Sequence, residues 1–181
     1  KYGHLDGLIY LKENVGLTVQ DFCDNDNAAI QYAAENGHVP VLKFFIDNIG
    51  LTAEDFRVNN NYAIRNASEN GHVNVIDFLH TIGLDITDFR STNNAAIKLA
   101  AENGHVHVLN YLKEKVGLTV TDFTSSNNRP IELALESGNH VNVIKFFYNK
   151  VGLTAPDFRY IIQLAVKRGW IGLLEFLKND I

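Results

Sequence analysis

The sequence contains no methionine, only one cysteine, and no apolar run longer than a few residues. A lone Cys23 cannot form an internal disulfide, which is typical of a reducing compartment, so a cytoplasmic or nuclear location is expected. The short apolar runs exclude a membrane-spanning helix, which needs roughly 20 mostly apolar residues, and no signal-peptide pattern occurs. Because the chain starts at Lys1 and lacks methionine, we interpret it as a piece of a longer protein.

Positive charge is scarce as well. The chain has 16 Lys and Arg against 21 Asp and Glu, which gives a formal net charge of -5, and no basic cluster stands out. Binding to a nucleic-acid backbone depends on clustered Lys and Arg, so nucleic acid is not expected as a partner. With 46% hydrophobic and 20% charged residues the composition is globular.

A block of about 34 residues recurs along the chain. One marker of this repeat is Asp-Phe, and the steps between its copies are 34, 33, 34 and 35 residues. The copies are Asp21-Phe22, Asp55-Phe56, Asp88-Phe89, Asp122-Phe123 and Asp157-Phe158. A second marker, Gly-His, keeps the same phase. Two markers in phase predict a stacked solenoid, whose long repeated surface suits binding better than a closed catalytic pocket.

Each copy predicts two helices. In residues 28–36, apolar residues at i, i+3 and i+4 mark one face of a short first helix. Gly37 ends it, as expected of a residue that tolerates the left-handed conformation. A second helix is expected from Val39 to Ile49, closed by Gly50. Before each first helix stands an Asn, at Asn27, Asn61, Asn94 and Asn128, which we interpret as a helix cap or turn residue.

A third, shorter helical turn is predicted around the Asp-Phe marker. Thr52 can cap it, and Asp55 three residues later completes an approximate capping box. Leu51 and Phe56 occupy the two positions of a hydrophobic staple. The same pattern recurs in the other copies, with Asp85 replacing Thr in one of them.

The residues resemble the ankyrin repeat. Residues 28–38, AAIQYAAENGH, are similar to the family signature TPLHLAAxxGH, and RPIELAL at 129–135 keeps its proline. The resemblance implies an all-α solenoid of paired antiparallel helices. GLTxxDF stands where the family has a β-hairpin finger, so short helical turns are expected there instead. The near-identical, Asn-rich copies resemble ankyrin arrays of giant viruses and other intracellular agents, which would place the protein in host cytoplasm.

We expect one repeat domain over residues 1–181. Its first Gly-His lies at residues 3 and 4, so the chain opens in the middle of a repeat. The last copy has a shortened tip, and Trp170 replaces its histidine, as in an atypical terminal repeat. The expected units are a partial repeat 1–26, full repeats 27–60, 61–93, 94–127 and 128–159, and a capping repeat 160–181.

Two ladders of polar residues have structural interpretations. Histidines recur at His38, His72, His105 and His140. Stacked helices lie about 8 to 10 Å apart, whereas zinc ligands lie about 2 Å from one ion, so we predict no metal site and expect each ring to bond a turn. The glutamates Glu35, Glu69, Glu102 and Glu136 form either a solvated face or an acidic stripe for a basic partner. Asn66 stands in an apolar column and needs a partner, for which Tyr32 is our hypothesis.

Neither a cofactor site nor a catalytic group is predicted, and Cys23 has no neighbouring base. The chain is therefore expected to be a protein-protein interaction module, not an enzyme, and monomeric apart from contacts at its truncated N-terminal face. The alternative is the scaffold or substrate-adaptor portion of a larger enzyme or ubiquitin-ligase assembly. In the resembled family, first helices and fingers form a concave binding surface.

The partner-binding residues are expected where copies differ, because repeated positions are explained by packing. Such variation could also reflect drift on an unused surface. The predicted set is Asp24, Asp26, Gln31, Asn59, Tyr62, Arg65, Thr92, Lys98, Arg129, Glu132 and Tyr160.

Overall fold

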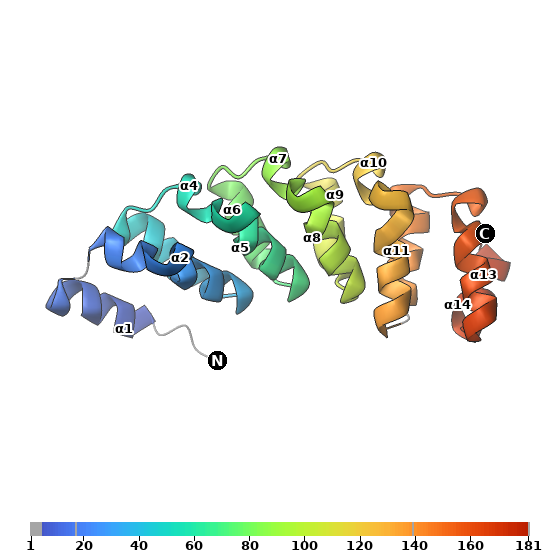
Figure 1. Ribbon diagram of the computed structural model, residues 1–181, viewed down its shortest axis with the longest axis horizontal. Coiled ribbons are helices and arrows are strands. Elements are labelled where there is room, and N and C mark those ends of the chain that lie inside the picture. The colour runs from blue at the N-terminus through green and yellow to red at the C-terminus, as the bar shows by residue number, and fades with distance from the viewer. Residues whose placement is uncertain (1–4, 17, 139, 181) are drawn as a thin grey trace.

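The computed structural model describes residues 5–16, 18–138 and 140–180, without the side chains of 23–26, 127, 128, 155, 156, 179 and 180. In these residues it contains helices and no strand, as predicted. The helices stand side by side in a single arched row, with residues 5–16 at one end and residues 159–180 at the other (Figure 1). None of the described helices combines the length and apolar character that crossing a bilayer requires.

The row consists of paired helices joined by short turns. First helices are α2 (Val19–Glu35), α5 (Val58–Glu69), α8 (Ser91–Glu102), α11 (Ser125–Gly138) and α13 (Arg159–Arg168). Second helices are α1 (Leu5–Tyr10), α3 (Val39–Phe44), α6 (Val73–Thr81), α9 (Val106–Glu114), α12 (Val141–Phe146) and α14 (Ile171–Asp180). The short turns are α4 (Ala53–Phe56), α7 (Ile86–Phe89), α10 (Val120–Phe123) and the 3₁₀ turn η4 (Ala155–Phe158). Neighbouring first helices contact one another along the row.

One continuous core runs through the row. Each first helix contributes an isoleucine that is fully buried in the four inner copies, at Ile30, Ile64, Ile97 and Ile131. Alanines beside these residues, such as Ala33 and Ala34, are also buried and let neighbouring helices approach closely. The predicted apolar face of the first helix is therefore confirmed as the repeat–repeat contact.

The second helices end differently from the prediction. After Phe44 the chain continues as a π turn over Phe45–Ile49, and similar π turns occupy Leu11–Val15 and Phe147–Val151. The copies with a π turn have 12 positions from His to Gly, as from His38 to Gly50, whereas the copy without one has 11 from His72 to Gly83; the copy with His105 and Gly117 also has 12 but ends in an ordinary turn. An additional residue in a helix is commonly accommodated as a π turn. Gly50 closes the turn at a φ of 87°, as its position after the helix predicts.

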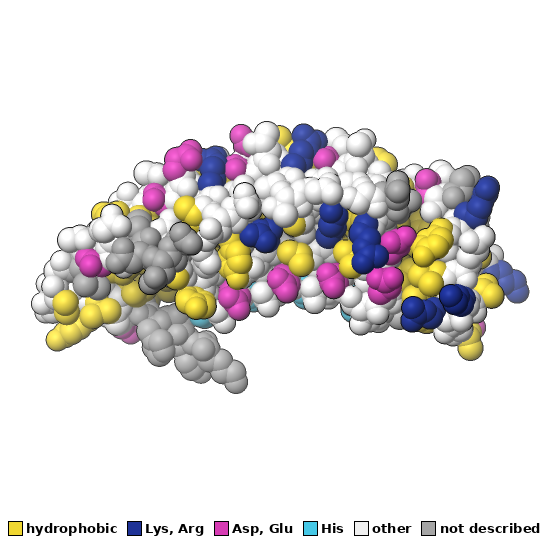
Figure 2. Space-filling model, viewed as in Figure 1, with side chains coloured by type: hydrophobic (Ala, Val, Ile, Leu, Met, Phe, Trp, Pro, Cys, Tyr) yellow, Lys and Arg dark blue, Asp and Glu magenta, His cyan; other side chains and the backbone are white. Residues whose placement is uncertain are grey.

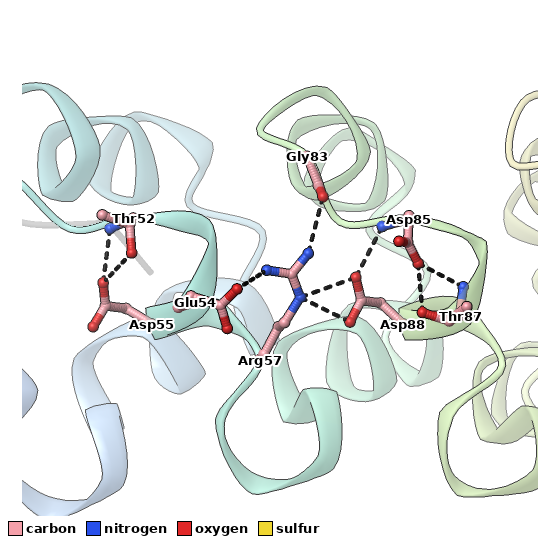
Figure 3. A network of polar contacts seen from close by, with 8 residues as sticks. All are labelled: Thr52, Glu54, Asp55, Arg57, Gly83, Asp85, Thr87 and Asp88. Carbon is pink, nitrogen blue, oxygen red and sulfur yellow. Dashed lines mark hydrogen bonds and ion pairs between the residues drawn. The ribbon is translucent and has the colours of Figure 1, made fainter.

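The predicted short turns are present. The backbone N–H of Thr52 donates to Asp55 Oδ2 over 2.7 Å, which is half of the predicted capping box (Figure 3). Leu51 and Phe56 are both buried beside it. In the copy without Thr, the Asp85 backbone N–H donates to Asp88 Oδ2 over 2.8 Å in the same way, and the Asp85 carboxylate also accepts from the Thr87 backbone N–H over 2.7 Å. These capping contacts explain why the Asp-Phe marker recurs.

At the start of α5 and of α8 the backbone winds the opposite way for three residues. Residues Asn59, Asn60 and Asn61 have φ values of 52°, 55° and 57°, and residues 92–94 repeat this left-handed turn. Asn27 also has a positive φ, of 58°. Asn tolerates this conformation better than most residues, so the turn interpretation of the Asn ladder is confirmed at these positions. Asn128 lies outside the described side chains.

Candidate binding surface

The Gly-His marker forms a joint between successive repeats. His72 Nε2 donates to the carbonyl of Glu35 over 2.9 Å, and His105 Nε2 donates to the carbonyl of Glu69 over 2.9 Å. The expected bond to a turn is present, but the acceptor belongs to the end of the preceding repeat's first helix. At Gly37, a Cβ atom would lie 2.9 Å from His72 Nδ1, so the glycine also leaves room for the ring. In the described residues no group of three or more His, Cys, Asp or Glu could hold a metal ion.

A second joint pairs arginine with aspartate. Arg57 Nε lies 3.0 Å from Asp88 Oδ1, and Arg57 Nη2 donates to the carbonyl of Gly83 over 3.0 Å (Figure 3). In the next repeat, Arg90 bonds both carboxylate oxygens of Asp122 over 2.8 and 2.9 Å. The sequence analysis missed these pairs, although an Arg directly after Asp-Phe in both copies was the available signal.

The electrostatics of this joint favour the ionised carboxylate. Burial by itself would raise the pKa of Asp122, but hydrogen bonds from Arg90 and Thr119 outweigh it and hold that pKa below its usual range. The pKa of Arg90 is raised by its hydrogen bond to Asp122. The repeated Arg and Asp residues are therefore occupied in holding the repeats together.

Structure sorts the predicted partner-binding residues into three groups. Exposed side chains are Asn59, Thr92 and Tyr160; partly buried ones are Gln31, Tyr62, Arg65, Lys98, Arg129 and Glu132. Asp24 and Asp26 lie outside the described side chains. The second group is only partly exposed, because first helices of neighbouring repeats pack side by side. Figure 2 shows Lys and Arg side chains in a row over α5, α8 and α11, with acidic side chains in a row below it.

Tyr62 and Arg65 lie together on α5. The Arg65 guanidinium carbon is 5.2 Å from the centre of the Tyr62 ring, which is a cation–π contact. Arg65 Nη2 also donates to the carbonyl of Asn59 over 2.8 Å, so this arginine supports the left-handed turn. Arg65 therefore has a structural role, through its contacts with Tyr62 and with the Asn59 carbonyl.

The other positively charged residues of the predicted set differ in whether they already form an ion pair. Arg129 Nη1 lies 3.1 Å from Glu132 and 3.3 Å from Glu136 on the same helix. The hydrogen bond to Glu132, more than other neighbours, raises the pKa of Arg129. Lys98 on α8 forms no ion pair with any described residue. It is therefore the cation of this row that is available without breaking an existing pair.

Asn66 has a different partner from the one hypothesised. Its Nδ2 lies 3.5 Å from Glu35 Oε2, at the limit of a hydrogen bond, while Tyr32 is 67% exposed. Tyr32 holds the same place in α2 as Asn66 does in α5, but the contact from Asn66 across the two helices goes to Glu35. Glu35 is thereby drawn into a contact between repeats through both its carbonyl and its carboxylate.

Comparison with known proteins supports the architecture. A family model described as ankyrin repeats (3 copies) matches residues 66–157, slightly more than half of the chain. The search of curated proteins found no match, and neither did the search of solved structures. The paired helices, the Gly-His joints and this match lead to one conclusion: the chain belongs to the ankyrin-repeat family.

Proposed function

We propose that the face formed by α5, α8 and α11, together with the left-handed turns at residues 59–61 and 92–94, binds a protein segment that crosses successive repeats. Ankyrin repeats generally act as protein–protein interaction modules. The observation that carries the proposal is the pairing of Tyr62 with Arg65 beside an uncommitted Lys98. Tyr and Arg are enriched among residues that dominate binding energies, and neither Tyr62 nor Lys98 forms part of the Gly-His or Arg–Asp joints described above.

The charges of this face describe the partner. An acidic group opposite Lys98 would gain a pair without displacing one, whereas Arg129 is already paired with Glu132 and Glu136. Basic groups would lie opposite Glu69 and Glu102, the last residues of α5 and α8. Complementary charges of this kind mainly set specificity and association rate. The Gly-His and Arg–Asp contacts hold successive repeats in a fixed arrangement. A partner that spans several repeats therefore binds a preorganised surface.

Direct binding measurements test this function. A partner is first captured on the purified chain and identified by crosslinking mass spectrometry, and its affinity is then measured by calorimetry. Tyr62→Ala and Lys98→Glu should each weaken binding by roughly tenfold, or about 1.4 kcal/mol. Arg65 is avoided because its loss would also disturb the tip.

The matched control is Lys150→Glu, an exposed lysine of the π turn Phe147–Val151 on the second-helix side. It changes net charge as Lys98→Glu does but should leave affinity unchanged. Thermal unfolding of each variant shows whether the array stays folded. Equal affinity in all three variants would assign the captured partner to another surface and contradict the proposal.

A further inference from the structure

The side of the array formed by the second helices differs from one repeat to the next. The residues five positions after His38, His72, His105 and His140 are Lys43, Asp77, Asn110 and Lys145. Lys43 Nζ lies 3.1 Å from Asp47 Oδ2 within its own repeat. Asp77 accepts a hydrogen bond from the Tyr111 hydroxyl of the next repeat over 2.7 Å. The first two of these positions therefore already have partners within the chain.

Tyr111 closes the space between α6 and α9. The His80 ring packs edge-on against the Tyr111 ring with 6.2 Å between their centres, and His80 Nδ1 lies 3.3 Å from the tyrosine hydroxyl. Burial, more than the nearby Asp77, raises the pKa of Tyr111, so its hydroxyl stays protonated and keeps donating to Asp77. Between α9 and α12 the equivalent residue is Phe146, which has no hydroxyl to form such a bridge.

A groove of about 630 Å³ lies between α9 and α12 instead. Its lining includes Val106, Asn110, Lys145, Phe146, Asn149 and Lys150. The side chains of Asn110 and Asn149 form no hydrogen bond with any described residue. The groove therefore places apolar surface, from Val106 and Phe146, next to amide groups that can still donate and accept.

The charge of this groove is positive, although the whole chain has a formal net charge of -5. None of the residues that line it is acidic, and neither Lys145 nor Lys150 forms an ion pair with any described residue. Lys145 Nζ lies 5.3 Å from the centre of the Phe176 ring on α14, a cation–π contact that holds the ammonium group in place. Glu114, at the end of α9, already lies 3.6 Å from Lys113. An acidic ligand would therefore meet two unpaired cations here.

The spacing of the two lysines suits an extended chain. Lys145 and Lys150 are five positions apart, and a helix rises about 1.5 Å per residue, so their backbones lie at most roughly 7.5 Å apart along the axis. Alternate residues of an extended strand lie about 6.6 to 6.8 Å apart and point to the same side. Carboxylates at alternate positions of an extended segment can therefore reach both lysines.

We propose that the groove between α9 and α12 binds an extended acidic segment of a partner protein, with carboxylates at alternate positions. The two carboxylates pair with Lys145 and Lys150, and this complementary charge identifies the class of partner. The side-chain amides of Asn110 and Asn149 bond the backbone of the segment, since each amide both donates and accepts. An apolar side chain two positions before the carboxylates covers the apolar part of the groove. Second helices form this groove, so the inference does not depend on the function proposed above for the first helices.

A short labelled peptide with the pattern Val-Ser-Glu-Ser-Glu-Ser is the probe. It is titrated with the 181-residue protein and followed by fluorescence anisotropy. Binding is expected at low ionic strength and should be lost in about 1 M salt, where the Debye length falls to about 3 Å. A matched peptide with Gln in place of both Glu keeps the shape but not the charge, and should bind roughly tenfold more weakly. A third peptide with the two Glu adjacent keeps the charge but changes the spacing, and should also bind more weakly.

Protein variants locate the site. Lys145→Gln and Lys150→Gln each remove one cation and should weaken binding roughly two- to fivefold. Asn110→Asp places a negative charge in the groove and should weaken binding roughly tenfold or more. The fold accepts Asp at this position, since Asp77 occupies it in the preceding repeat. Lys98→Gln, on α8 among the first helices, is the matched control and should leave binding unchanged.

Circular dichroism checks that each variant remains folded. The exposed Lys150 has no contact with Phe176 to lose, so its variant keeps the test decisive if Lys145→Gln disturbs α14. Absence of peptide binding, or equal binding of the Gln peptide, would overturn the proposal. So would an equal loss in Lys98→Gln, because the peptide would then not be held in this groove.

Three further results would contradict the proposed occupant. Equal binding of the peptide with adjacent Glu would exclude the extended arrangement. Displacement of the probe by an equal concentration of inorganic phosphate would show that the lysines take any anion. A labelled oligonucleotide that binds where the peptide does not, and is released by Lys150→Gln, would assign the groove to nucleic acid.

Discussion

Left-handed backbone at the tips depends on single residues. Outside glycine, this conformation costs roughly 1 to 2 kcal/mol per residue, and Asn and Asp bear it best. The left-handed turn at the start of α5 consists of Asn59, Asn60 and Asn61, whereas the one at the start of α8 has Thr92, at φ 52°, in the place of Asn59. Thr is β-branched, and such residues are rarely found there. Copies with the same fold therefore store different amounts of strain.

The first prediction follows from this comparison. Thr92→Asn should raise the free energy of unfolding by about 1 kcal/mol, because it relieves a β-branched residue from the left-handed region. The reverse change, Asn59→Thr, should lower it by a similar amount. Urea denaturation followed by circular dichroism measures both. If the two variants changed stability in the same direction, strain at this position would not be the cause.

His105 predicts a pH dependence. Burial, more than any other influence, lowers the pKa of this imidazole, even though the ring donates to the Glu69 carbonyl. A histidine with a lowered pKa binds its proton more readily in the unfolded chain, so it favours folding above the unfolded pKa of about 6.5. That contribution is lost as pH falls below 6.5 towards the folded pKa. The free energy of unfolding should therefore drop between pH 7 and 5.

Replacing the ring separates this effect from other titrations. His105→Gln keeps an N–H donor for the carbonyl but cannot titrate. Its free energy of unfolding, measured by urea denaturation at several pH values, should fall less steeply over the same interval than that of the unaltered chain. Parallel curves would show that protonation of another group is responsible.

At the scale of elements, the sequence predicted what local chemistry determines. The capping contact between Thr52 and Asp55 involves residues three apart, and Gly37 ends its helix because glycine adopts a positive φ. Both features depend on local sequence, so they could be predicted from a single copy. The partners across repeats could not. Arg57 and Asp88 are 31 residues apart, and their contact depends on how α5 stacks on α8. The same dependence on stacking hid the Glu35 partner of Asn66 and the partial burial of Tyr62.

Gly71 and Gly117 separate the two reasons for a glycine, a positive φ and a lack of space for a side chain. Both have positive φ, 76° and 82°, but a Cβ at Gly71 would lie 2.7 Å from His105 Nδ1, while Gly117 has nothing within 4 Å. Alanine at either position should cost about 1 kcal/mol from backbone strain. Gly71→Ala should cost a further 1 to roughly 3 kcal/mol, because the ring must shift and its bond to Glu69 weakens.

A double variant is the control for the second cost. In Gly71→Ala with His105→Ala the steric conflict is absent, so the two costs should not add. Denaturation midpoints of the single and double variants give this coupling directly. Fully additive losses would mean that the ring moves aside without penalty, and the joint would then rest on the hydrogen bond alone.

For the whole molecule, position in the row matters as much as sequence. Stability in a stacked array comes from each repeat and from its interfaces with neighbours. Ile97 is fully buried between repeats, whereas Ile162 of the last first helix occupies the same place in the pattern and is 37% exposed. Val166 and Ile171 beside it are 65% and 69% exposed. The C-terminal face therefore shows the apolar positions that inner repeats cover.

The same substitution at Ile97 and at Ile162 tests whether stability depends on contacts between neighbouring repeats. Ile97→Ala removes buried methyl groups from an interface with little room to collapse and should cost about 2 to 5 kcal/mol. Ile162→Ala removes the same atoms from a face that the described residues leave 37% exposed, and it should cost less than half of that. Denaturation curves give both values, and hydrogen exchange shows where each variant opens. Because stacking couples neighbouring repeats, the Ile97 variant should lose amide protection on both sides of α8, while the Ile162 variant should lose it only in α13 and α14. Equal losses of stability would mean that burial between repeats does not set the cost of these two substitutions.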